Sequence, residues 1–261
     1  MNAADARLGA AAPRMRIAKA MAHMGYRSRR RSEESVLAGR VAVNGVVVVD
    51  PSVSVAPGRD TITVDGKPLA PIVEYEYYAV NKPPGFISTV TDPHADWRVV
   101  DLVRSRARLY PVGRLDKDSE GLILLTNDGG FANRISHPSY QVEKEYAALV
   151  QPTPTNIMID RLRQGVVLNG RRAVPVRVAL RITNGEAWVR LVLHEGRKHE
   201  VRELLGEVHL EVRRLIRTRI GSFLLGSLKA GEHRKLKPSE VNEFLRSDGR
   251  SRSVSKREAS R

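Results

Sequence analysis

The chain has 261 residues, with 44 Lys or Arg against 29 Asp or Glu, so its formal net charge is +15. It contains no cysteine, which excludes disulfides and thiolate metal sites, and no stretch approaches the ~20 apolar residues that span a bilayer. A globular protein this basic usually binds a polyanion. We expect nucleic acid as the partner. An anionic membrane surface is the alternative, although no segment combines a strongly apolar face with a basic one.

The first predicted domain is a small helix and hairpin unit over residues 14–72, which follows an N-terminal extension of residues 1–13. In chain order we expect helices at Ile17–Met24 and Ser28–Ala38, a hairpin at Val41–Val48 and a strand at Thr61–Val64. The hydroxyl of Ser28 is suited to cap the second helix, and Gly25 and Gly39 are suited to end the first and second helices. The pair Asn44-Gly45 between β-branched residues predicts a tight hairpin turn, since both turn residues accept positive φ.

A run of arginines surrounds the start of the second predicted helix, namely Arg27, Arg29, Arg30 and Arg31, and Arg40 follows its end. Such a run is usually a solvated face of a helix. In a chain of net charge +15 we favour contacts with phosphates instead. The segments Met15–Lys19, Gly25–Arg30 and Gly39–Gly45 together resemble an S4 RNA-binding domain. That resemblance implies RNA contacts from Arg27, Ser28, Arg29, Arg30 and Arg40.

The second predicted domain covers residues 73–245 and is reached through a proline-containing linker at residues 68–74. We expect strands at Tyr77–Asn81, Leu122–Thr126, Tyr146–Val150, Val174–Ile182, Trp188–Leu193 and Val212–Arg219, with helices at Thr155–Gln164 and His199–Leu205. Many connections are too short for helical crossovers, so the predicted class is α+β with a mainly antiparallel mixed sheet. Residues 246–261 have six basic and two acidic residues and little apolar mass, which predicts a disordered tail.

The stretch Gly113–Gly129 contains the carboxylates that we consider first for chemistry. Asp116 lies between Arg114 and Lys117, just before an apolar run, and neighbouring cations favour an ionised carboxylate. An ionised carboxylate can act as a nucleophile or a base. Asp118 and Asp128 are rivals for that role, and a surface ion pair is the alternative for Asp116.

Four blocks in the chain resemble, in order and spacing, the RsuA/RluB/RluE/RluF family of pseudouridine synthases. They are Asn81–Gly85, Gly113–Gly129, Ser136–Tyr146 and Glu195–Arg202. The resemblance implies that Asp116 is the catalytic carboxylate, that Tyr146 stacks on the target base, and that Arg202 pairs with the aspartate. It also implies RNA contacts or base-flipping support from Arg114, and RNA contacts from Lys82, Arg197 and Lys198.

The resemblance implies a reaction without redox or phosphoryl-transfer steps, so we expect neither a cofactor nor a metal. Asp92, His94 and Asp96 do not have the spacing of a metal site, and His194 and His199 lack a triad partner.

The implied partner is ribosomal RNA, with 23S rRNA preferred, 16S rRNA as the alternative, and an immature subunit as a further form of the substrate. We expect a cytoplasmic monomer. The rival interpretation is a noncatalytic RNA-binding factor in ribosome assembly.

Overall fold

A computed structural model describes residues 14–70, 74–90, 97–194, 196–197 and 199–246. The chain divides into two units, Met1–Tyr75 and Glu76–Arg261, which are described separately below. The predicted N-terminal extension lies outside the described residues, and so does the predicted tail apart from Arg246. In the part of the chain that is described, no helix is both long and apolar enough to cross a membrane.

The N-terminal unit packs two helices against a small sheet. Its elements are β1 (Met15–Arg16), α1 (Ile17–His23), α2 (Arg29–Leu37), β2 (Val41–Val43), β3 (Val46–Val48), β4 (Ser54–Val55), β5 (Ile62–Val64) and β6 (Lys67–Pro68). The four-stranded sheet has the order β3-β2-β5-β6, and β1 pairs with β4. Ile17, Met21 and Val36 from the helices bury their side chains against Val41 and Ile62 of the sheet.

Local signals in the sequence explain where these elements begin and end. Ser28 caps α2 through a hydrogen bond from the Arg31 backbone N–H to its hydroxyl oxygen, 3.3 Å long. Gly25 and Gly39 follow the two helices with φ of +78° and +67°, as left-handed helix ends require. Asn44 and Gly45 both have positive φ at the β2–β3 turn. The predicted caps and hairpin of this unit are therefore confirmed.

The C-terminal unit is built on a nine-stranded mixed sheet. Its strands are β7 (Tyr77–Lys82), β8 (Tyr110–Val112), β9 (Glu120–Thr126), β10 (Lys144–Gln151), β13 (Arg177–Thr183), β14 (Glu186–Leu193), β15 (Glu211–Ile220), β16 (Phe223–Leu224) and β17 (His233–Lys235). The main path is β13-β14-β10-β15-β9-β7-β17, with β16 on β15 and β8 on β9. All pairs are antiparallel except β15 with β9, so the predicted α+β class with a mainly antiparallel mixed sheet is confirmed.

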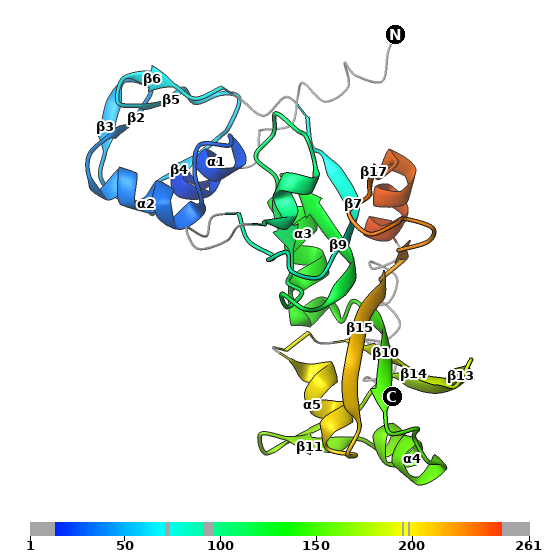
Figure 1. Cartoon of the computed structure of the whole chain (residues 1–261). Helices are drawn as coiled ribbons and strands as arrows, with labels where there is room; N and C mark the ends of the chain where they lie inside the picture. The colour runs from blue at the N-terminus through cyan, green and yellow to red at the C-terminus, as the bar shows by residue number, and fades with distance from the viewer. Residues whose placement is uncertain (1–13, 71–73, 91–96, 195, 198, 247–261) are drawn as a thin grey trace. The chain divides into compact units, whose positions relative to one another are not determined.

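Shorter elements connect and cover this sheet. They are η2 (Val99–Leu102), α3 (Gly129–Ser136), η3 (Pro138–Tyr140), α4 (Asn156–Gln164), the hairpin of β11 (Val166–Leu168) with β12 (Arg171–Ala173), and α5 (Glu200–Gly206). Residues 238–246 are also helical. Figure 1 shows α5 beside β15, which runs next to β10. The sequence prediction missed α3, the β11–β12 hairpin, the strands β8, β16 and β17 and the helix at residues 238–246, and it began the β13 strand three residues early, at Val174 instead of Arg177.

Strand β9 is buried on both faces. Ile123 and Leu125 belong to one hydrophobic cluster, whereas Leu122 and Leu124 belong to another on the opposite face. A strand with both faces buried has a continuous apolar run instead of an alternating one. This burial gives a rigid base to the loop that precedes β9, which carries Asp116.

Candidate active site

A cavity of about 500 Å³ opens in the C-terminal unit and brings Asp116 and Tyr146 together. Asp116 comes from the loop between β8 and β9, and Tyr146 from β10. Tyr146 is 7% exposed, whereas the Asp116 side chain is 37% exposed. Other polar residues in the cavity wall are Arg114, Ser119, Ser136, Lys144, His194, Arg197, His199, Glu200 and Arg217. Two of the three side chains expected at the catalytic centre thus line one cavity.

The loop that carries Asp116 is held by several buried hydrogen bonds. The Nζ of Lys82 donates to the carbonyl oxygens of Lys117 (3.1 Å), Ser119 (2.7 Å) and Pro83 (2.9 Å). The hydroxyl of buried Ser88 bonds to both backbone groups of Leu115. The backbone on both sides of Asp116 is therefore fixed before any ligand binds.

The expected RNA contact from Lys82 is wrong. Its side chain is fully buried, and all three hydrogens of its ammonium group have a backbone carbonyl as acceptor. Burial lowers the pKa of Lys82 to about 8, and the charges of Asp118, Glu120 and Asp116 oppose that shift. Lys82 positions the Asp116 loop and is not available to RNA.

We expect the difference in the free energy of unfolding between wild type and Lys82→Met (the stability gap) to depend on pH. An unfolded lysine has a pKa of ~10.4, so between pH 8 and 10 the unfolded chain binds more protons at this site than the folded chain. Wild-type stability should rise relative to Lys82→Met by about 2 kcal/mol from pH 7.5 to 9.5. Urea unfolding followed by tryptophan fluorescence measures this gap. Lys117→Met, at an exposed site in the same loop, serves as the control. A gap that stays constant over this pH range would contradict the prediction.

The structure does not bring Arg202 to Asp116. Within the described residues, Arg202 lies outside the cavity wall, and its Nη1 donates to the carbonyl oxygen of Val212 at 3.1 Å. Among the described residues, His199 has an ion-pair geometry with the Asp116 carboxylate, with Nε2 3.5 Å from Oδ1. His199 immediately precedes α5 and has a φ of +60°. This left-handed backbone conformation differs from that of the helix that follows, so the His199 side chain is directed differently from the helical side chains. The catalytic role of Arg202 stays a prediction.

Lys144 and Arg217 are cavity residues that sequence reasoning did not single out. Lys144 lies two residues before Tyr146 on β10, so both side chains occupy the same face of the strand. Burial lowers the pKa of Lys144 to about 8, and the charge of Arg217 lowers it further, while Glu200 opposes. The cavity wall contains more cationic than anionic side chains, which suits an anionic ligand. Lys144 belongs to the Ser136–Tyr146 block that the sequence analysis recognised. No local signal in the sequence indicates Arg217.

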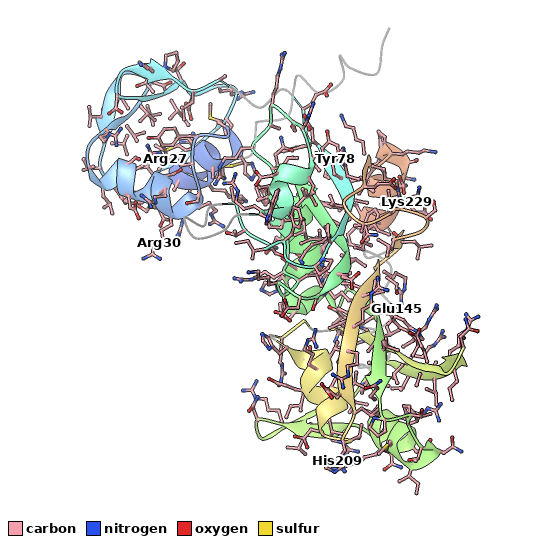
Figure 2. The ribbon with its side chains drawn as sticks, viewed as in Figure 1. Arg27, Arg30, Tyr78, Glu145, His209 and Lys229 are labelled. Carbon is pink, nitrogen blue, oxygen red and sulfur yellow. The ribbon has the colours of Figure 1, made fainter. Side chains whose placement is uncertain are left out.

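The arginines expected to contact RNA occupy exposed positions, whereas Ser28 is partly buried. Arg27, Arg29 and Arg30 are exposed around the start of α2, and Arg30 extends away from the helix in Figure 2. Arg40 is exposed but forms a bidentate ion pair with Asp65. The hydrogen bonds that Arg40 donates hold the pKa of the Asp65 carboxylate below its usual value. In the C-terminal unit, Arg114 and Arg197 are exposed at the cavity. Lys198, like Asp92, His94 and Asp96, lies outside the described residues.

Comparison with known proteins places this chain in a defined class of RNA-modifying enzymes. Residues 76–207 match the family model described as RNA pseudouridylate synthase, and residues 15–60 match that of the S4 domain. The chain therefore belongs to the RNA pseudouridylate synthase family, which confirms the resemblance found in the sequence. The chain is therefore an isomerase, and it also contains an N-terminal S4 domain.

Individual relatives are similar over nearly their whole length. An uncharacterized RNA pseudouridine synthase of Aquifex aeolicus (strain VF5) is 38% identical over 238 residues, which are 90% of this chain and 95% of that protein. The ribosomal large subunit pseudouridine synthase B of Bacillus subtilis (strain 168) is 37% identical, with 87% of this chain and 93% of that protein covered. A crystal structure of a pseudouridylate synthase aligns with a TM-score of 0.62 and 28% identity, over 88% of this chain and 99% of that chain.

Proposed function

We propose that this enzyme converts one specific uridine of 23S ribosomal RNA to pseudouridine, with Asp116 as the nucleophile. The observation that carries the proposal is the cationic cavity in which Asp116 and Tyr146 lie together. The likeness to the large-subunit enzyme of Bacillus subtilis supports the choice of 23S rRNA. The alternative substrate is 16S rRNA, and the rival role is that of a noncatalytic RNA-binding assembly factor.

The reaction moves a base without any change in its oxidation state. The bond between N1 and C1′ breaks, the uracil ring turns, and C5 forms the new bond to C1′. C5 then loses its proton, while N1 ends with a proton. In our proposal the carboxylate of Asp116 attacks C1′ and forms a covalent intermediate as the N1–C1′ bond breaks, and the carboxylate is released again when C5 forms its bond to C1′. Because the detached base must not escape, a walled cavity such as this one suits the reaction.

Tyr146 provides the platform for the flipped base in this proposal. Stacking on an aromatic ring contributes about 1 to 3 kcal/mol per base, and extruding a base costs a few kcal/mol. The two energies are similar, so one tyrosine together with phosphate contacts supports base flipping. Arg114 and Arg197, exposed at the cavity, are the proposed phosphate contacts nearest to the target nucleotide.

The S4 domain is proposed to bind ribosomal RNA through Arg27, Ser28, Arg29, Arg30 and Arg40. Four of these residues lie around the start of α2 and Arg40 lies just before β2, and the four arginines are exposed. A cytoplasmic monomer that acts on free 23S rRNA or on an immature large subunit completes the proposal. The net charge of +15 supports binding to a polyanion of this kind.

Tritium release from RNA labelled at C5 of uridine tests the proposal directly, because the C5 proton leaves in each turnover. We expect the wild-type enzyme to release tritium from unmodified 23S transcripts, and none from 16S transcripts. Release from 16S alone would overturn the choice of substrate. Absence of release from both transcripts and from immature subunits, despite RNA binding, would support the assembly-factor role instead.

A further inference from the structure

Arg217 is a buried cation at the junction of the strands that carry the proposed catalytic groups. It lies on β15, which runs between β10 and β9 in the sheet. Across one ladder it is opposite Tyr146 of β10, and across the other it is opposite Gly121 of β9. Asp116 and Tyr146 come from segments that do not pair with each other, so β15 is the structural link between them.

The guanidinium of Arg217 bonds to the backbone on both sides of Asp116. Its Nε donates to the carbonyl oxygen of Leu122 at 2.7 Å, and its Nη1 donates to the carbonyl oxygen of Arg114 at 3.2 Å. Arg114 and Leu122 bracket the loop that contains Asp116. The planar guanidinium reaches the two acceptors with separate nitrogens in a fixed fork, a geometry that the single nitrogen of a lysine at this position does not reproduce.

Stability alone does not account for an arginine at this position. Arg217 is 4% exposed, its Nη2 has no hydrogen-bond partner, and no carboxylate among the described residues forms an ion pair with it. A buried charge without a counter-ion is unfavourable, and an apolar side chain of similar size is often as stable or more stable. A residue that is unfavourable for folding but lines the cavity is best explained by function.

We propose that Arg217 is a positioning residue that sets the placement of the Asp116 carboxylate relative to Tyr146. It acts through the carbonyl oxygens of Arg114 and Leu122 and needs no contact with the substrate. Lys82 holds the same loop from the β7 side, whereas Arg217 ties it to the strand that pairs with β10. The inference rests on the proposed role of Asp116 as the nucleophile.

Single-turnover rates with excess enzyme on 23S transcripts test the inference, because they separate chemistry from binding. We expect Arg217→Met and Arg217→Lys to lower the rate by about 100-fold, the loss that a misplacement of ~1 Å can cause. The dissociation constant for RNA should stay within about threefold of wild type, because Arg217 is only 4% exposed and its Nε and Nη1 donate to backbone carbonyls. Arg213→Met is the matched control, since Arg213 is on the same strand, exposed, and paired with Glu211.

Chemical rescue distinguishes positioning from a general loss of structure. Guanidinium ion added to Arg217→Ala should restore the rate by about tenfold, because it can occupy the vacated site and donate to both carbonyls. The same addition should leave Asp116→Asn inactive.

A wild-type rate for Arg217→Met beside an inactive Asp116→Asn would overturn the role of Arg217 alone. An active Asp116→Asn would overturn the proposed function as well. If Arg217→Met does not fold, Arg217→Lys and the rescue of Arg217→Ala test the proposal instead. A wild-type rate for Arg217→Lys together with no rescue of Arg217→Ala would refute the proposal.

Discussion

Replacement of Asp116 by asparagine is expected to reduce pseudouridine formation by roughly 10⁴-fold or more, because an amide is not a nucleophile toward the nucleoside. The substitution keeps the size of the side chain. It also keeps the backbone contacts of the loop, which come from Lys82, Ser88 and Arg217 and do not involve the carboxylate. Folding should therefore be unaffected.

RNA affinity should be retained or slightly increased in Asp116→Asn, since the change removes a negative charge from a cavity that faces a polyanion. Tritium release and filter binding, measured on the same transcript, check both parts. Asp118→Asn is the control: Asp118 is two residues away in the same loop, is exposed and does not line the cavity. Full turnover by Asp116→Asn, or loss of turnover in Asp118→Asn alone, would move the catalytic assignment away from Asp116.

Gly121→Ala is expected to destabilise the C-terminal unit by about 4 kcal/mol, which is exceptional for the addition of one methyl group. Gly121 has a φ of +100°, and a Cβ built there would lie 2.4 Å from the Arg217 carbonyl oxygen and 2.7 Å from its backbone nitrogen. Both are backbone atoms in the parallel pairing of β15 with β9. They cannot move aside without separating the two strands.

A second glycine separates the effect of close packing from the effect of positive φ. Gly185 has a φ of +76° in the turn between β13 and β14, and nothing lies within 4 Å of its built Cβ. Gly185→Ala should cost only about 1 kcal/mol. Both tryptophans, Trp97 and Trp188, belong to the C-terminal unit, so urea unfolding followed by their fluorescence reports on this unit. Equal losses in the two variants would show that the strands can accommodate the methyl group.

The Gly121 and Arg217 predictions concern the same place in the fold. The absence of a side chain at Gly121 lets β15 approach β9 closely, and this approach puts Arg217 within reach of the carbonyl oxygens of Arg114 and Leu122. We therefore expect a variant that folds with a larger residue at position 121 to lose the contacts of Arg217 as well. The loop that carries Asp116 would then keep only the contacts of Lys82 and Ser88 among those described above.

The sequence by itself determined the features that depend on neighbouring residues. The Ser28 cap, the left-handed ends at Gly25 and Gly39, and the Asn44-Gly45 turn need only the local backbone, because each follows from the conformations that a few adjacent residues can adopt. The motif around Asp116 was recognisable for the same reason, since its residues are contiguous. The family match then confirmed the α+β class and the enzyme class.

Only the tertiary structure decided which cations are buried and what they hold. Lys82 and Lys144 both belong to recognised blocks, yet Lys82 is enclosed by carbonyl groups 35 and 37 residues away in sequence, while Lys144 lines the cavity. Arg217 bonds to carbonyl oxygens 95 and 103 residues away. No local pattern in a chain with 44 basic residues marks such a side chain. Its partners are brought to it by the pairing of β15 with β9 and β10, which is a long-range property of the sheet.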